Sequence, residues 1–198
     1  MNLRSVLEER QEKKIKGDLE DTVRHIFGNR IPRDFFITSG IGESDIAVHA
    51  GSYHLALKNA GIEGYNHLTY SSILPAIANE ILQPNSYVHG SVMEGIAAVS
   101  NSEMGKRATA ALIFGWLHNK ETGKKYGGLV CESAGSDSEA EVRESLKASL
   151  YELYSNGYSD EFLLDQIKFI SKSFIPIKKF GTAIVALCFT SYVQPVSL

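Results

Sequence analysis

Residues 107–133, RATAALIFGWLHNKETGKKYGGLVCES, place a short polar stretch between two apolar segments. RATAALIFGWLH and YGGLVCES each have the length and apolar content of a strand. Between them, NKETGKK is polar and contains a glycine, which is typical of a hairpin connection. The stretch therefore predicts two antiparallel neighbours in one sheet, not the strand–helix alternation of a doubly wound nucleotide fold.

Two helices are predicted on either side of this hairpin. Residues 136–157 give the clearest pattern, because Ser138 and Glu141 form a capping box in front of an apolar face. A shorter helix is predicted at residues 51–62, with Ser52 as its N-cap. Each helix is expected to end at a glycine, Gly61 in the shorter helix and Gly157 in the longer.

The remaining patterns predict strands. Residues 65–70 alternate, with Asn66, Leu68 and Tyr70 on one face, which we expect to point into the structure or its site. Two helices against about seven strands, joined mostly as hairpins, predict an α+β fold: a layered αββα sandwich of mostly antiparallel sheets. The other strands are predicted at 35–37, 86–100, 166–177 and 181–192. Gly40 and Gly42 should end the first of these, and a helical start near 160–165 is an alternative for the third. Pro75 should end regular strand pairing after the serine pair.

Composition narrows the class of protein. The chain has 198 residues, enough for one domain at 31–198 after a charged, helical extension at 1–30. We favour the interpretation that this extension is solvated over the interpretation that it is a partner-binding helix. A net charge of -3 leaves no electrostatic footprint for nucleic acid. Cys131 and Cys188 match no metal spacing or disulfide framework, so a reducing cytoplasm is expected. With no long apolar run and no signal-peptide pattern, we expect no membrane partner.

Familiar catalytic motifs are missing from the sequence. The GIG fragment at 40–42 lacks the third glycine of a dinucleotide loop and is interpreted as a tight turn. The histidines are scattered, and the five-residue spacing of His49 and His54 is a weak basis for a metal site. We therefore expect no metal.

The serine pair in LTYSSILP, residues 68–75, permits a different chemistry. A serine can attack the carbonyl that precedes its own nitrogen, and the resulting ester can undergo β-elimination. The chain then breaks, and the serine becomes a pyruvoyl group on the new N-terminus. This reaction needs a hydroxyl in second place, a carbonyl in reach and a packed frame that stores strain. Because serine pairs are common, spacing alone favours an ordinary loop.

The neighbouring motifs strengthen the catalytic interpretation. NAGIEGYNHLTYSSILP closely resembles the segment around the self-cleavage site of the pyruvoyl-dependent arginine decarboxylases, and its IEGYN run is similar to the bacterial branch of that family. The resemblance covers about residues 34–192 and includes three further motifs, SGIGESD, GGLVCE and KKFGTAIVALCF.

The resemblance implies a role for each matching residue. Cleavage would fall between Ser71 and Ser72, giving a β chain to Ser71 and an α chain from Ser72, which would become the pyruvoyl group. Asn66 would orient groups at the reaction centre, and Glu132 would be the proton donor. An amino acid would condense with the pyruvoyl ketone as a Schiff base and lose CO2, so that arginine yields agmatine without PLP or metal.

The setting of Glu132 suits a proton donor. It lies in an apolar strand, where burial would raise the pKa of its carboxyl and keep it protonated. The alternative is that Glu132 points to solvent from an open face of the strand. The sequence by itself favours that alternative, whereas the resemblance favours the acid.

His54 departs from the family pattern, which usually has Asp at this position in the substrate pocket. A histidine removes a negative charge that would suit a cationic substrate. Either His54 has turned outward on its helix, or Glu63 or Asp45 supplies the charge, or the substrate is another amino acid. A third hypothesis is an unprocessed, non-catalytic binding or assembly subunit. The resemblance also implies a homo-oligomer, a trimer or a hexamer of cleaved protomers, with the site between neighbours.

Overall fold

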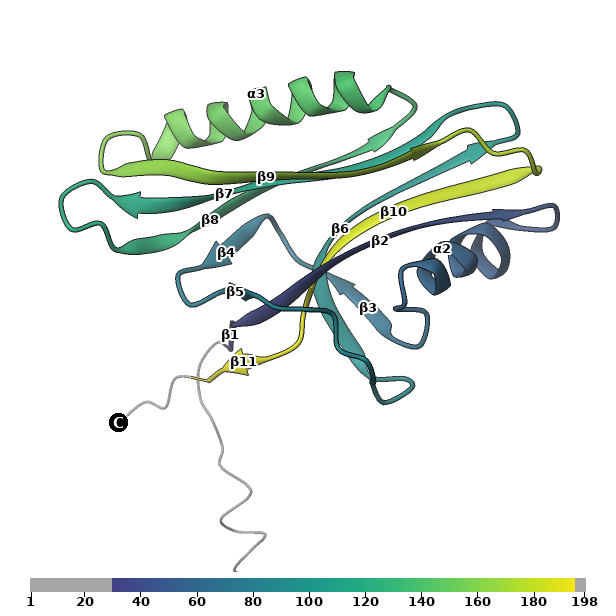
Figure 1. Cartoon of the computed structure of the whole chain (residues 1–198), viewed down its shortest axis with the longest axis horizontal. Helices are drawn as coiled ribbons and strands as arrows, with labels where there is room; N and C mark the ends of the chain where they lie inside the picture. Colours follow the sequence, from purple (N-terminus) through teal and green to yellow (C-terminus); the bar gives the residue numbers. More distant parts are fainter. Residues whose placement is uncertain (1–29, 195–198) are drawn as a thin grey trace, which may run out of the picture. The chain divides into compact units, whose positions relative to one another are not determined.

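Two β-sheets lie face to face, and helices cover the outer face of each (Figure 1). The structure is a computed structural model that describes residues 30–194, so the predicted extension lies outside the described residues except for Arg30. These layers belong to the unit Pro32–Tyr192; the second unit, Met1–Ile31 with Val193–Leu198, is described only at residues 30–31 and 193–194. The prediction of an α+β layered sandwich is confirmed.

The larger sheet has five strands in the order β3-β6-β10-β2-β5. Its long central strands pair antiparallel, β6 with β10 and β10 with β2, whereas the short edge strands β3 and β5 run parallel to their neighbours. The strands are β2 (Asp34–Ser44), β3 (Asn66–Thr69), β5 (Asn79–Glu80), β6 (Val92–Glu103) and β10 (Phe180–Phe189).

The smaller sheet has the order β4-β8-β7-β9, and all of its pairs are antiparallel. The predicted hairpin at residues 107–133 is confirmed as β7 and β8, and Pro75 ends β4 as expected. The strands are β4 (Ile73–Pro75), β7 (Ala108–Asn119), β8 (Lys125–Gly135) and β9 (Phe162–Phe174); β1 (Ile31–Pro32) and β11 (Tyr192–Val193) pair separately.

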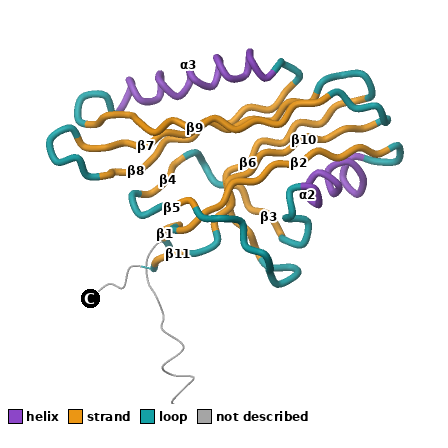
Figure 2. The backbone as a smooth tube through the Cα atoms, viewed as in Figure 1, coloured by secondary structure: helices purple, strands orange, loops and turns teal. Residues whose placement is uncertain are grey.

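One long helix covers the smaller sheet. α3 (Glu139–Gly157) runs along the outer face of this sheet (Figure 2). It packs on β7 and β8 through Val142, Leu146 and Leu150. Its capping box is present as predicted, because Ser138 accepts from the Glu141 backbone and Glu141 accepts from the Ser138 backbone.

The larger sheet is covered by a wide helical turn, η1 (Val48–Tyr53), which continues into α2 (His54–Asn59). Gly61, with φ at 70°, follows α2 as predicted. Ser52 is not an N-cap: it is buried inside η1, where its hydroxyl is 2.9 Å from that of Thr182.

Gly40 and Gly42 do not end β2, so the predicted tight turn is wrong. Both lie within the strand, directly below the helical layer. A Cβ atom on Gly40 would stand 2.1 Å from the Ala56 carbonyl oxygen, and one on Gly42 2.1 Å from that of Ser52. Glycine is required because helix and strand backbones touch here.

Apolar side chains from both sheets form the central core. Phe35 of β2 packs edge-on against Phe114 of β7, with ring centroids 6.2 Å apart. Other buried members of this core are Leu74, Ile96, Leu112, Val130, Val185 and Leu187.

Strand β9 begins at Phe162, so the alternative of a helical start near 160–165 is wrong.

Candidate active site

The serine pair lies where the chain passes from one sheet to the other. β3 belongs to the larger sheet and β4 to the smaller, and Ser71 and Ser72 connect them. On one side of the pair, the Tyr70 backbone N–H donates to the Gly95 carbonyl of β6 at 2.7 Å. On the other side, the Ser72 carbonyl accepts from the Val130 N–H of β8 at 3.0 Å. The bond between Ser71 and Ser72 is therefore held from both sheets.

The backbone makes a tight three-residue turn around Ser72. The N–H of Ile73 donates to the carbonyl oxygen of Ser71 at 2.9 Å. This hydrogen bond draws electron density from the carbonyl that a Ser72 hydroxyl would attack. Neither serine has a positive φ, and Ser71 is exposed with Ser72 half-buried. In the single chain the Ser71–Ser72 bond is therefore less tightly packed than expected, and the turn brings Ser72 close to the carbonyl.

The Ser72 hydroxyl contacts a carboxylate. It donates to Glu132 Oε2 at 2.8 Å, across 60 residues of sequence. Glu132 follows Val130 on the same face of β8, because side chains alternate along a strand. A hydroxyl and a carboxylate at this distance can exchange a proton.

Glu132 is exposed, as in the alternative that the sequence by itself favours, and the burial expected of a proton donor is wrong for the single chain. β4 covers β8 only from Gly127 to Leu129, and Glu132 lies beyond that covered part. Its neighbour Cys131 points to the opposite face, toward the cluster below α3, where burial and then the Glu132 carboxylate raise the pKa of its thiol.

A second hydrogen-bonded pair lies beside the serines. The Tyr70 hydroxyl donates to Glu94 Oε2 at 2.6 Å, and the Tyr70 ring packs on Phe189 with centroids 5.7 Å apart. Glu94 is only 2% exposed. Sequence reasoning placed Tyr70 on an inward face but missed its partner Glu94, although an acidic residue inside the apolar run VMEGIAAV was a usable signal.

Asn66 is not brought to the Ser72 hydroxyl within the chain. Its side-chain amide donates to the Gly90 carbonyl at 2.8 Å, and it pairs with Val92 at the opposite end of β3 from the serines. Asn66 is exposed and Leu68 is 54% exposed. The expectation that Asn66, Leu68 and Tyr70 point into the structure is confirmed for Tyr70, which packs against the central core, and is wrong for Asn66 and Leu68 in the single chain.

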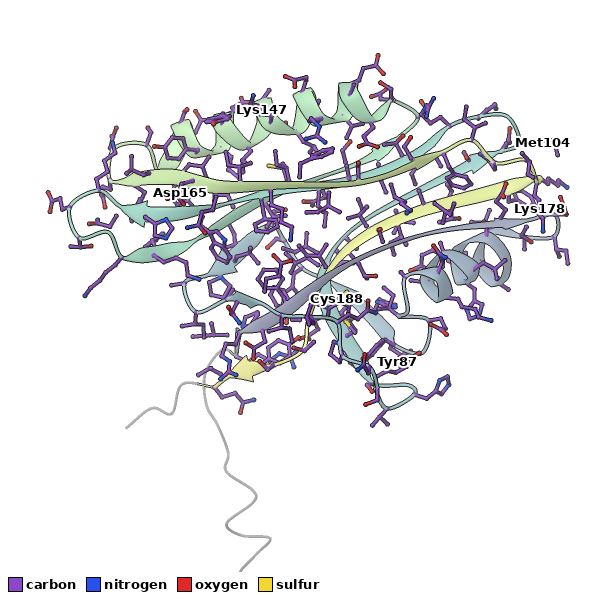
Figure 3. The ribbon with its side chains drawn as sticks, viewed as in Figure 1. Tyr87, Met104, Lys147, Asp165, Lys178 and Cys188 are labelled. Carbon is purple, nitrogen blue, oxygen red and sulfur yellow. The ribbon has the colours of Figure 1, made fainter. Side chains whose placement is uncertain are left out.

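The candidate substrate-binding residues lie apart from Ser72. Asp45 accepts from the Lys179 N–H at 3.1 Å. Figure 3 labels the neighbouring Lys178 at one end of the structure, near Met104, and labels Cys188 well away from that end. His54 is exposed at the start of α2, which agrees with the outward alternative, and Glu63 is half-buried in the turn before β3.

The distance between these groups follows from strand register. Tyr70 is level with Gly95 of β6, to which its backbone N–H donates. Gly95 pairs with Cys188 of β10, and Cys188 pairs with Phe36 of β2, so these residues lie at one level across the larger sheet. Ser44, the last residue of β2, is eight positions beyond Phe36, and Asp45 follows it. At about 3.3 Å per residue, the levels of Phe36 and Ser44 are roughly 26 Å apart.

Metal and membrane features are absent from the described part of the chain. Within residues 30–194, no group of three or more His, Cys, Asp or Glu side chains is placed to hold a metal ion. Over the same residues, every helix is too short or too polar to span a bilayer.

Comparison with known proteins points to one family. A sequence model described as pyruvoyl-dependent arginine decarboxylase matches residues 34–194. A relative from Methanocella arvoryzae, named pyruvoyl-dependent arginine decarboxylase, is 34% identical over 104 residues. That alignment spans 50% of this chain and 60% of the relative.

Proposed function

The chain belongs to the pyruvoyl-dependent arginine decarboxylase family, and from this premise we propose that it is a self-processing decarboxylase that converts arginine to agmatine and CO2. The observation that carries the proposal is the 2.8 Å hydrogen bond from the Ser72 hydroxyl to Glu132. A hydroxyl must lose its proton to become a nucleophile, and a carboxylate at this distance can accept it.

The first step of self-cleavage uses three groups of the turn. As Glu132 takes the hydroxyl proton, Ser72 Oγ forms a bond to the Ser71 carbonyl carbon. The bond from that carbon to the Ser72 nitrogen breaks, and the proton passes to the released amine. The Ile73 N–H, already 2.9 Å from the carbonyl oxygen, stabilises the negative charge that develops there. The product is an ester between Ser71 and the Ser72 side chain.

The second step breaks the chain. Ser72 loses a proton from Cα, its Cβ–Oγ bond breaks, and Ser71 leaves as a new C-terminal carboxylate. Ser72 is now dehydroalanine, which tautomerises, adds water and releases ammonia to leave a pyruvoyl group. No oxidant or reductant is needed, because each step only moves electron pairs from bonds that break to bonds that form.

The residues present fit such a group. The half-buried Ser72 ends an exposed crossing between the sheets, with a carboxylate already aimed at its side chain. The pyruvoyl ketone supplies the site at which a substrate amine condenses and the electron sink for loss of CO2. Glu132, which loses its hydroxyl partner on cleavage, would hold the proton that is delivered to the product.

The distance between Asp45 and the serines supports a site that is shared by two copies of the chain. Asp45 lies just beyond the level of Ser44, which is roughly 26 Å along the sheet from the level of Tyr70. We therefore propose a homo-oligomer, a trimer or a pair of trimers, in which one copy supplies Ser72 and Glu132 and its neighbour supplies Asp45. The same arrangement would give Asn66, exposed on β3, a surface to contact.

Intact mass tests the self-cleavage proposal. The purified protein should separate into two chains that end at Ser71 and begin at residue 72, in place of one chain of 21.8 kDa. Ser72→Ala should stay whole, because it has no hydroxyl to attack. Ser71→Ala is the matched control and should cleave, since Ser71 contributes only its carbonyl. A wild-type chain that stays whole would contradict the proposal and support a non-catalytic binding or assembly subunit.

The substrate has one competing proposal. Because His54 replaces the aspartate implied by the family resemblance and faces outward, the same chemistry could act on another amino acid. Release of CO2 from a panel of amino acids decides between the two. Arginine should give the highest kcat/KM, and no turnover of arginine with turnover of an uncharged amino acid would reverse the assignment.

A further inference from the structure

The hydrogen bond between Tyr70 and Glu94 has no part in the steps above. Glu94 is 2% exposed, and a buried carboxylate is unfavourable unless other groups bond to it. The Tyr70 hydroxyl, 2.6 Å away, is one such group. Tyr70 is also the residue that precedes Ser71, so this hydrogen-bonded pair adjoins the peptide bond that would break.

Two adjacent residues of β6 hold Tyr70. Glu94 accepts from its hydroxyl, and Gly95 accepts from its backbone N–H at 2.7 Å. β6 is itself packed closely on β10, because a Cβ atom on Gly95 would stand 2.3 Å from the Leu187 carbonyl oxygen. Tyr70 is therefore fixed to the interior of the larger sheet through both its side chain and its backbone.

The other side of the scissile bond is fixed to the smaller sheet. Val130 donates to the Ser72 carbonyl, and Glu132 accepts from the Ser72 hydroxyl. Ser71, between the two attachments, is exposed. The orientation of its carbonyl toward Ser72 Oγ consequently depends on how firmly residues 70 and 72 are held.

We propose that Tyr70 and Glu94 are positioning residues for self-cleavage: their hydrogen bond anchors the chain before Ser71 and so orients the Ser71 carbonyl for attack by Ser72. This inference rests on the proposed function. It assigns the pair to the acyl shift, the step in which the carbonyl must face the hydroxyl, and not to the later elimination.

The test compares two tyrosine hydroxyls. Tyr70→Phe removes the bond to Glu94 and keeps the ring against Phe189. Tyr154→Phe is the matched control, because the Tyr154 hydroxyl is also part-buried and donates to the Phe162 carbonyl at 2.8 Å, but it belongs to α3. Each chain is made by cell-free translation, and the loss of intact mass is followed with time. We expect cleavage about tenfold slower or more in Tyr70→Phe, and unchanged in the control.

Hydroxylamine separates the acyl shift from the elimination. It cleaves the ester directly, leaving a hydroxamate on Ser71 and an unmodified Ser72 at the new N-terminus. If the pair acts on the acyl shift, Tyr70→Phe should remain slow with hydroxylamine present. Full recovery of cleavage by hydroxylamine would show that the ester forms normally and would overturn the inference.

The double variant Tyr70→Phe/Glu94→Gln separates positioning from stability. Glu94→Gln replaces the carboxyl group beside the new phenylalanine ring with a neutral amide, so the double variant should recover part of the thermal stability. Cleavage should nevertheless stay slow. Recovery of the cleavage rate together with the melting temperature would overturn positioning in favour of a structural role. A wild-type chain that never cleaves would instead contradict the proposed function, so the two failures are distinguishable.

Discussion

The carboxylate of Glu132 accepts from the Ser72 hydroxyl and should govern the rate of self-cleavage. Glu132→Gln keeps an oxygen that can accept this hydrogen bond but cannot take the proton. We expect processing to slow by about 10²-fold or more, which is the usual contribution of a general base. Intact mass over time, on freshly translated chains, measures the rate.

Glu144→Gln provides the control for this prediction. Glu144 is an exposed glutamate of α3 and makes the same change of charge away from the serines. It should cleave at the wild-type rate. If Glu132→Gln cleaves as fast as this control, another group must take the hydroxyl proton.

His67 should make stability sensitive to acid. Burial lowers the pKa of its imidazole below the usual range, with a smaller opposing effect from the Ile62 carbonyl, which accepts from Nε2 at 3.0 Å. The unfolded chain therefore binds the proton more readily than the folded one. The stabilisation is complete above the unfolded pKa and is lost as pH falls through the folded value. The melting temperature should fall between about pH 7 and pH 5.

His67→Gln should reduce this acid dependence, since glutamine can donate to Ile62 but does not titrate. His89→Gln, at an exposed position in the loop before β6, should leave the dependence unchanged. Equal slopes in His67→Gln and the wild type would assign the acid sensitivity to other groups.

Two glutamates show how far sequence reasoning extends to the site. Glu94 and Glu132 both lie in apolar strands, and the same argument for burial applies to each. Glu94 is buried because β3 and β10 pair with β6 on its two sides, level with Leu68 and Phe189. Glu132 is exposed because β4 stops before reaching it. Whether a neighbouring strand covers a given residue depends on how the strands pair in the folded chain. The alternation of apolar and polar residues along one strand does not predict that pairing.

At the scale of elements, the close approach of the helical layer to β2 should make Gly42 intolerant of a side chain. A Cβ atom there would stand 2.1 Å from the Ser52 carbonyl oxygen and 2.4 Å from the Ala56 nitrogen, so backbone must move. We expect Gly42→Ala to lower the free energy of unfolding by about 3 kcal/mol. Urea denaturation of the variant and the wild type measures the difference.

Gly135→Ala is the matched control, because a Cβ atom at Gly135 in β8 meets nothing within 4 Å. It should change the free energy of unfolding by no more than about 0.5 kcal/mol. A similar loss in both variants would indicate a general effect of strand glycines and not a backbone contact.

Elements with a local signal were predicted well. The capping box of α3 and the polar turn between β7 and β8 are encoded within a few residues, and both are confirmed. The prediction that Gly40 and Gly42 end the strand is wrong because glycine is needed there for another purpose: a helical segment from later in the chain packs against the strand backbone at these positions. Ser52 was misread as a cap for a related reason, since its partner is Thr182, 130 residues away.

At the scale of the whole molecule, the separation between the serines and Asp45 bears on whether one chain could supply the whole site. Ser72 and Glu132 lie next to Tyr70, which is level with Phe36 near the start of β2, whereas Asp45 follows the last residue of β2. Side chains cannot bridge the roughly 26 Å between the two levels. If both sets act on one substrate, neighbouring copies must supply them.

Mixing two impaired chains tests a shared site. Ser72→Ala cannot form the pyruvoyl group, and Asp45→Asn removes the charge expected to attract arginine while keeping an oxygen for the Lys179 N–H. Each variant alone should decarboxylate arginine poorly. Assembled from a mixture, some sites would combine an intact Ser72 from one copy with an intact Asp45 from its neighbour, and CO2 release should exceed the sum of the separate variants. A mixture that gives only that sum would place both residues' functions within one chain, whereas full activity of Asp45→Asn alone would remove Asp45 from the site.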